Sequence, residues 1–127
     1  MPKNPIPKPT EGELELLQVL WQRGPSTVRE IHDALSGDKA TGYTTTLKIL
    51  QKMTDKGLVR RDETSRSHIY EPAIQAEQTQ RQLAGDLLKR AFGGSPARLV
   101  VAALSAQKTS RADLAEIRRL LDEIEGK

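Results

Sequence analysis

The side chains best suited to bind another molecule lie in the stretch GYTTTLKILQKM, residues 42–53. If this stretch is helical, at about 100° per residue its hydroxyl and ammonium groups gather on one side. That side carries Thr41, Thr44, Thr45, Lys48 and Lys52. Threonine can hydrogen-bond a base or a phosphate, its methyl group can contact thymine, and lysine neutralises a phosphate. The pattern predicts a recognition helix whose N-terminal threonines face base edges in the DNA major groove.

The other side of this helix is expected to face a core. It carries Tyr43, Thr46, Leu47, Leu50 and Met53, and Ile49 lies at its edge. Threonine is a mediocre helix former, because its branched side chain loses freedom against the preceding turn. We therefore interpret the threonines as a compact polar end that faces DNA. A simpler interpretation stays open, in which the exposed threonines only cap the helix and face water.

A second candidate contact follows in the segment LVRRDETSRSHIYEPAI, residues 58–74. Its β-type pattern predicts a hairpin with strands at 58–62 and 68–71, ended by Pro72. Arg66 lies at the tip, next to Ser67 and His68. An arginine in a polar turn is usually only solvated, but beside a recognition helix it can contact a phosphate or the minor groove.

Two helices must precede these elements to position them. Thr10-x-x-Glu13 and Thr27-x-x-Glu30 are capping boxes, and Gly24-Pro25 ends the first helix. In the second helix Val28, Ile31, Ala34 and Leu35 are expected to face inward. Three helices followed by a hairpin is the order of a winged helix-turn-helix domain, here residues 10–74. The expected contacts of the hairpin with the helices are Leu58, Ile69 and Tyr70.

The flanking segments differ in character. Residues 1–9 contain four prolines and are expected to form a disordered tail. Residues 75–127 predict three amphipathic helices with too little apolar surface for a core of their own. The segment LVVAAL, residues 99–104, is uniformly apolar, so we expect burial against a second copy of the chain. The dimerisation residues predicted in this helical domain are Leu99, Val100, Ala103, Leu104, Leu114, Ile117, Leu121 and Ile124.

The sequence lacks the residues that other classes of function require. The 127 residues include no cysteine, which excludes disulfides and cysteine-ligated metals, and the two histidines belong to no catalytic or metal-binding constellation. We therefore expect no catalytic site, no metal and no cofactor. The segment from residue 39 to residue 68 contains seven basic and three acidic residues, so its net charge is +4, compared with +3 for the whole chain. Without an apolar run of ~18 residues or a signal-like N-terminus, we expect a cytoplasmic protein without stable membrane association.

The sequences TEGELELLQVLWQRGPSTVREIHDAL, YTTTLKILQKMTDKGLVRRDE and RSHIYEPAI together resemble the penicillinase-repressor family of bacterial transcriptional regulators. The resemblance covers residues 10–125. It implies a winged-helix homodimer that binds inverted-repeat operator DNA and represses promoters. It also implies base and phosphate contacts from Thr44, Thr45, Lys48 and Lys52, and backbone contacts from the wing at Arg66, Ser67 and His68.

Two departures from the family pattern limit this resemblance. Copper-responsive members carry a C-terminal cysteine motif that this chain lacks, so copper sensing is not expected. Members that respond to β-lactams are cleaved at an Asn-Phe bond, and an approximate alignment places Ala102-Ala103 there. A sensor protease is thus a possible partner. The alternative function is a winged-helix adaptor that binds protein, which would require exposed apolar residues on the third helix.

Overall fold

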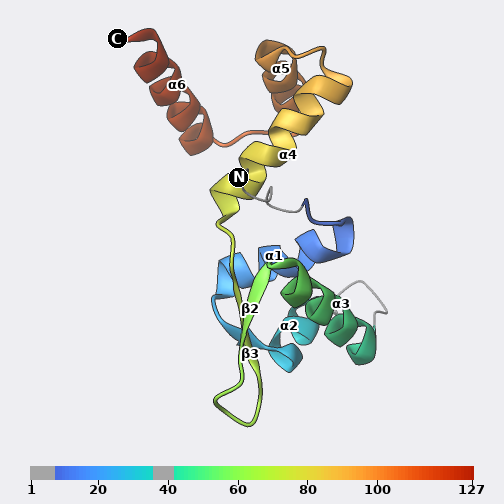
Figure 1. Ribbon diagram of the computed structural model, residues 1–127. Coiled ribbons are helices and arrows are strands. Elements are labelled where there is room, and N and C mark those ends of the chain that lie inside the picture. The colour runs from blue at the N-terminus through green and yellow to red at the C-terminus, as the bar shows by residue number, and fades with distance from the viewer. Residues whose placement is uncertain (1–7, 36–41) are drawn as a thin grey trace, which may run out of the picture. The chain divides into compact units, whose positions relative to one another are not determined.

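The computed structural model of the protein describes residues 8–35 and 42–127 (Figure 1). Thr41, Lys39 and most of the tail predicted at 1–9 lie outside these ranges. The described chain contains six helices and three short strands, and it divides after Leu83 into two compact units. In order, the elements are α1 (Glu11–Arg23), β1 (Ser26–Thr27), α2 (Val28–Leu35), α3 (Tyr43–Lys56), β2 (Val59–Asp62), β3 (Ile69–Pro72), α4 (Ala76–Ala91), α5 (Pro96–Ala106) and α6 (Arg111–Glu125).

Both predicted capping boxes are confirmed. At α1, the N–H of Glu13 donates to Thr10 Oγ1 at 3.2 Å and the N–H of Thr10 donates to Glu13 Oε1 at 2.9 Å. At α2, the N–H of Glu30 donates to Thr27 Oγ1 at 3.1 Å and the N–H of Thr27 donates to Glu30 Oε1 at 2.8 Å. Each box satisfies two backbone donors that a helix start leaves without partners, so the two helices begin where the sequence dictates.

The core of the first unit lies between α1, α2, α3 and the hairpin. It is built from apolar side chains at helical spacing together with the ends of the strands. Its buried members are Leu16, Leu17, Leu20, Val28, Ile31, Leu50, Met53, Leu58, Val59, Tyr70 and Ile74. Of the predicted hairpin contacts, Leu58 and Tyr70 are fully buried, while Ile69 is half-buried.

Two residues expected in this core lie elsewhere. Ala34 is exposed, because the stripe that α2 buries is centred on Val28 and Ile31 and Ala34 falls outside it. Tyr43 is 42% exposed. It is the first residue of α3, so no earlier turn of the helix covers it. The remaining predicted core positions of α3 are buried or half-buried.

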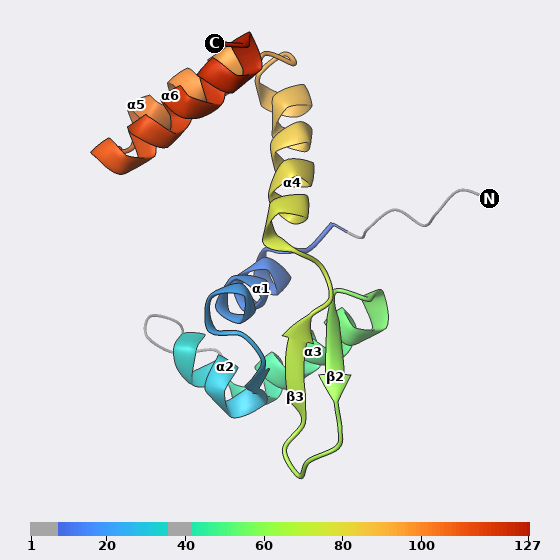
Figure 2. The same ribbon diagram turned by 90° about the vertical axis from the view of Figure 1, so that its left-hand side faces the viewer.

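The sheet has three antiparallel strands in the order β1-β3-β2, where the sequence predicted a two-stranded hairpin. β1 pairs Ser26 with Tyr70 and Thr27 with Ile69, and two residues are too few to show a strand period. Pro72 is the last residue of β3 and not the residue after it. Because β1 reaches only Ile69 and Tyr70, the sheet is two strands wide at this proline. Figure 2 shows the β2–β3 turn extending away from the helices of this unit.

The second unit contains the end of α4 and the whole of α5 and α6. Ser95 caps α5 by accepting from the N–H of Arg98 at 3.2 Å, with Pro96 as the first helical residue. Ser110 caps α6 by accepting from the N–H of Asp113 at 3.0 Å. No residue of α5 or α6 is buried. None of the helices in the described ranges has the length and apolarity needed to cross a membrane.

Candidate nucleic-acid interface

The outward face of α3 carries the predicted contact residues. Thr44, Thr45, Lys48 and Lys52 are all exposed. The residue that precedes the helix, Gly42, makes no side-chain cap, so the first N–H groups of α3 receive no capping side chain. A helix start of this kind attracts phosphate, since free N–H groups and the helix dipole both favour an anion. Because α3 begins at Tyr43 and its cap position is Gly42, Thr44 and Thr45 lie inside the first turn and not at the cap.

Thr46 differs from its neighbours, as the sequence predicted. It is fully buried, and its Oγ1 donates to the carbonyl of Gly42 at 3.4 Å. The same hydroxyl lies 3.3 Å from Nδ1 of His32 on α2. Thr46 therefore fixes the start of α3 against α2, which aims the two preceding threonines outward.

An ion pair between the exposed Lys56 and the buried Glu13 fixes the other end of α3. Lys56 Nζ donates to Glu13 Oε1 and Oε2 at 3.0 and 2.8 Å, which ties the last turn of α3 to the first turn of α1. Glu13 is only 3% exposed. Burial alone would raise its pKa, but the hydrogen bonds from Lys56 and from the backbone of Thr10 outweigh this effect and lower it. Glu13 is thus a charged group held inside the fold by its partners.

The basic side chains of α3 and the β2–β3 hairpin fall into two groups. Three of them pair with carboxylates: Lys56 with Glu13, Arg60 with Glu71 and Arg61 with Glu63, at N···O distances of 2.8, 3.2 and 2.6 Å. Lys48, Lys52 and Arg66 form no ion pair within the described residues. Half of the described positive charge between residues 39 and 68 is therefore neutralised inside the protein. The predicted contact residues are the ones whose charge remains available to a phosphate.

Local hydrogen bonds shape the wing tip. Asp62 Oδ1 accepts from the N–H of Thr64 at 2.9 Å and from its hydroxyl at 2.7 Å. These bonds lower the pKa of Asp62. Ser65 Oγ donates to the carbonyl of Ser67 at 2.7 Å, across the position of Arg66. The turn thus presents Arg66 from a hydrogen-bonded loop.

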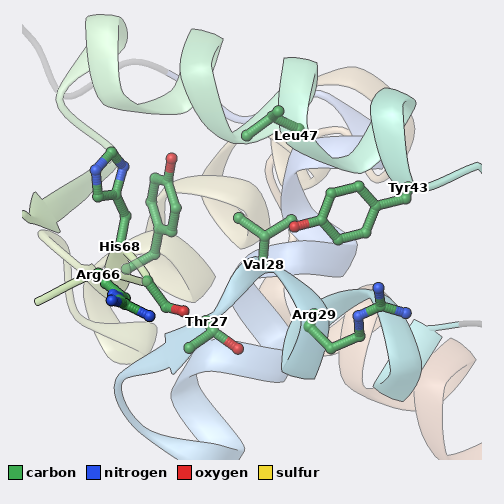
Figure 3. Close-up of a pocket in the computed structure, with 9 residues that line it drawn as sticks. Thr27, Val28, Arg29, Tyr43, Leu47, Arg66 and His68 are labelled. Carbon is green, nitrogen blue, oxygen red and sulfur yellow. The ribbon is translucent and has the colours of Figure 1, made fainter.

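A hollow of about 300 Å³ lies between α2, α3 and the hairpin (Figure 3). It brings together the predicted wing residues and residues that the sequence analysis did not assign to binding. The lining residues are Thr27, Val28, Arg29, Tyr43, Leu47, Arg66, Ser67, His68 and Tyr70. The DNA contacts predicted on α3 do not line this hollow, although Thr44 directly follows the lining residue Tyr43. Periodicity assigned Tyr43 to the core, and the only signal for Arg29 was its place in the first turn of α2.

The predicted dimerisation residues are only partly covered in the second unit. Leu99, Leu114 and Ile117 are half-buried, whereas Val100, Ala103, Leu104, Leu121 and Ile124 are exposed. Two further large apolar side chains, Val101 and Leu120, are 64% and 50% exposed. Neither residue was among the predicted dimerisation residues, although Val101 lies within the apolar segment 99–104.

Three helices, an antiparallel wing and an exposed basic third helix define a winged helix-turn-helix protein of the nucleic-acid-binding kind. More narrowly, the chain belongs to the penicillinase repressor family, whose family model matches residues 9–123. Both the fold class and the family predicted from the sequence are confirmed.

The chain is similar to two proteins named as a transcriptional regulator and a repressor. The chain is 34% identical over 118 residues to the transcriptional regulator BlaI of Mycobacterium tuberculosis, covering 90% of this chain and 84% of that protein. It is 23% identical over 118 residues to the penicillinase repressor of Bacillus licheniformis, covering 93% and 92%. The solution structure of monomeric Bacillus licheniformis BlaI with the blaP half-operator matches with a TM-score of 0.51 and 25% identity, over 57% of this chain and 89% of that one.

Proposed function

We propose that this chain is a sequence-specific DNA-binding repressor that acts as a homodimer on an inverted-repeat operator, in the bacterial cytoplasm where the DNA lies. The observation that carries the proposal is the exposed face of α3, with two threonines at its start and two unpaired lysines behind them. The half-operator complex of a related protein supports the same reading.

In this proposal α3 and the wing of the first unit contact different parts of the operator DNA. Thr44 and Thr45 reach base edges, because their short side chains let the start of α3 approach the groove closely. Lys48 and Lys52 neutralise phosphates along the wall of the groove. Arg66 contacts the backbone from the wing, with Ser67 and His68 beside it. We also assign Thr41, which lies outside the described residues, to this interface.

The homodimer is supported by the apolar surface of the second unit. Val101, Leu121 and Ile124 are each more than half exposed, at 64%, 52% and 72%. Isolated apolar residues are normal on a surface, but this unit leaves most of its large apolar side chains in water. A second copy of the same helices would cover them. Two recognition helices in successive major grooves then require half-sites about one helical turn, or a multiple of it, apart.

A protein-binding adaptor is less well supported. An adaptor face on α3 would present apolar residues to a partner. The exposed residues of α3 are threonines, lysines, Gln51 and Asp55, with Tyr43 as the one large apolar side chain among them.

A sensor protease is a further candidate partner. The bond aligned with the family's cleavage site, Ala102–Ala103, lies inside α5, and both alanines are exposed. Proteases cleave flexible segments in preference to folded helices, so cleavage there requires α5 to open locally. Mass spectrometry of the chain from induced cells would find fragments ending at residue 102 if this partner exists, and only intact chain if it does not.

The test of the main proposal is a fluorescence anisotropy titration against a labelled duplex from upstream of the protein's own coding region. A shuffled duplex of the same length serves as the control, and both are measured at two salt concentrations. We expect a preference of ~10³-fold or more for the native duplex, with two chains bound per site.

Equal, salt-sensitive binding to both duplexes would contradict sequence-specific recognition at this operator. Binding to neither duplex would contradict the DNA-binding proposal and favour the adaptor. One chain per site with full affinity would contradict the homodimer alone.

A further inference from the structure

Arg29 has a defined orientation although it lies on the surface. Its guanidinium carbon lies 5.2 Å from the centroid of the Tyr43 ring (Figure 3). The ring of His32 meets the same tyrosine in an edge-to-face contact, with centroids 5.8 Å apart and planes at 75°. A cation beside an aromatic face is attracted to it. Tyr43, itself supported by α2, therefore restrains the side chain of Arg29.

The charge of Arg29 is available for a ligand. Arg29 forms no ion pair within the described residues. The neighbouring carboxylate of Glu30 is already engaged, because it accepts from the N–H of Thr27 at 2.8 Å and lies 3.6 Å from Arg23 Nη2. Within the described residues, Arg29 is thus unpaired, as are Lys48, Lys52 and Arg66.

The hollow beside Arg29 has the composition of a phosphate site. Arg29 lines it from α2, on the side of Tyr43, while Arg66 and His68 line it from the hairpin (Figure 3). Thr27 and Ser67 add hydroxyl groups. No carboxylate occurs among the described residues that line it. Guanidinium groups bind phosphate through charge-assisted hydrogen bonds, often two at once, and a hollow without acidic groups does not oppose the anion.

We infer that this hollow receives a backbone phosphate of the operator, that Arg29 contacts this phosphate from α2, and that Tyr43 is a positioning residue for Arg29. The inference rests on the proposed function and extends it to residues outside the recognition helix and wing tip. Tyr43 directly precedes Thr44 and Thr45, so the phosphate would flank the bases that these threonines reach.

The first test compares Arg29→Gln with Arg60→Gln, which removes the same charge from an arginine paired with Glu71 and absent from the hollow. Arg29→Gln should lower operator affinity about tenfold, since one charge-assisted contact is lost. It should also reduce the slope of log K against log salt by about 0.9. Arg60→Gln should leave the affinity and the slope close to those of the parent protein. Equal effects of the two variants would overturn the inference.

The second test separates positioning by Tyr43 from contact by its hydroxyl. Tyr43→Phe keeps the aromatic face and should bind like the parent protein. Tyr43→Leu should weaken binding about two- to fivefold, the value of an exposed cation–π contact. In the Arg29→Gln background Tyr43→Leu should cause no further loss. A Phe variant as weak as the Leu variant, or fully additive losses, would contradict the positioning role.

Lys48→Ala in the same titrations distinguishes this inference from the proposed function. If the parent protein binds its operator and Lys48→Ala weakens binding while Arg29→Gln does not, only the role of Arg29 is wrong. If the parent protein shows no operator preference, the proposed function fails and the inference fails with it. Thermal melts should be alike for all these surface variants, which shows that each one is folded.

Discussion

At the scale of single residues, whether a basic side chain is unpaired matters more for DNA binding than how many basic side chains there are. Lys48 and Lys52 are separated by one helical turn on the exposed face of α3, and neither is paired within the described residues. Lys56, one turn further on, is withdrawn from this role by Glu13. Three lysines at equal spacing thus divide into two that can bind DNA and one that holds the fold.

This division predicts the effects of alanine substitutions on α3. Lys48→Ala and Lys52→Ala should each weaken operator binding and make its salt dependence shallower by about 0.9 in slope, because one phosphate contact is lost. Both variants should melt at the parent temperature. Anisotropy titrations at several salt concentrations measure the slope, and a slope equal to that of the parent protein would remove that lysine from the interface.

Glu13 connects pH to stability. Its pKa is lowered in the folded protein, so its contribution is fully present above the ordinary value of 4.5. The contribution is lost as the pH falls below 4.5 through the lower folded value. Glu13→Gln should therefore cost about 1–3 kcal/mol of unfolding free energy at pH 7 and much less at pH 3. Urea titrations at both pH values test this.

The control for this prediction is Glu77→Gln, which changes an exposed carboxylate in the first turn of α4. Its effect on the unfolding free energy should be small at both pH values. A difference between the parent protein and Glu13→Gln that stays constant from pH 7 to pH 3 would contradict the ion-pair account.

At the scale of the elements, one turn decides how the wing meets the recognition helix. Gly57 ends α3 with φ of 81° and ψ of 16°, and the N–H of Leu58 donates to the carbonyl of Met53 at 2.9 Å. The next residues are buried at once, since Leu58 and Val59 are 0% and 2% exposed. A change at this turn therefore affects the hairpin as well as the helix end.

We expect Gly57→Ala to destabilise the first unit by about 1–2 kcal/mol, because an L side chain opposes the left-handed conformation. A steric clash would not cause this loss of stability, because a Cβ added at Gly57 would have no atom from elsewhere in the fold within 4 Å. Gly57→Asn should lose less, since asparagine tolerates this conformation. Chemical denaturation of the two variants measures the difference, and equal losses would show that the backbone conformation is not the cause.

At the scale of the whole molecule, association of two chains is the step that should turn a weak contact into operator binding. Each recognition helix meets few base pairs, and pairing two of them adds their contacts at one high effective concentration. The second unit is suited to this role because no large apolar side chain of α5 or α6 is fully buried within one chain.

The prediction at this scale uses charge to separate the two copies. Leu121→Glu with Ile124→Glu should convert the proposed homodimer to a monomer and lower operator affinity steeply, while binding to a single half-site remains. These side chains are 52% and 72% exposed, so folding of one chain should tolerate the change. Ala115→Glu, at an exposed position about opposite on α6, is the control. Sedimentation that still reported a dimer would show that another surface joins the chains.

Most of the local structure followed from the sequence, because it depends on neighbours within four residues. Capping pairs such as Thr10 with Glu13 and Thr27 with Glu30 fix helix starts through bonds between residues three apart. The helical repeat was enough to expose Thr44 and Lys48 and to bury Thr46. The winged-helix order and the family could be predicted for the same reason, since both are carried by local patterns.

The tertiary structure decided what depends on distant neighbours. Glu13 lies 43 positions from Lys56, and no repeat indicates that this lysine is paired while Lys52 is not. β1 forms only because Ser26 and Thr27 meet β3, more than forty residues later. The hollow exists only because α2, the start of α3 and the hairpin converge, so that Arg29, Tyr43 and Arg66 line one space. The residues proposed to bind DNA could be listed from the sequence, but whether their charges are paired, and which of them share a surface, is set by packing across the chain.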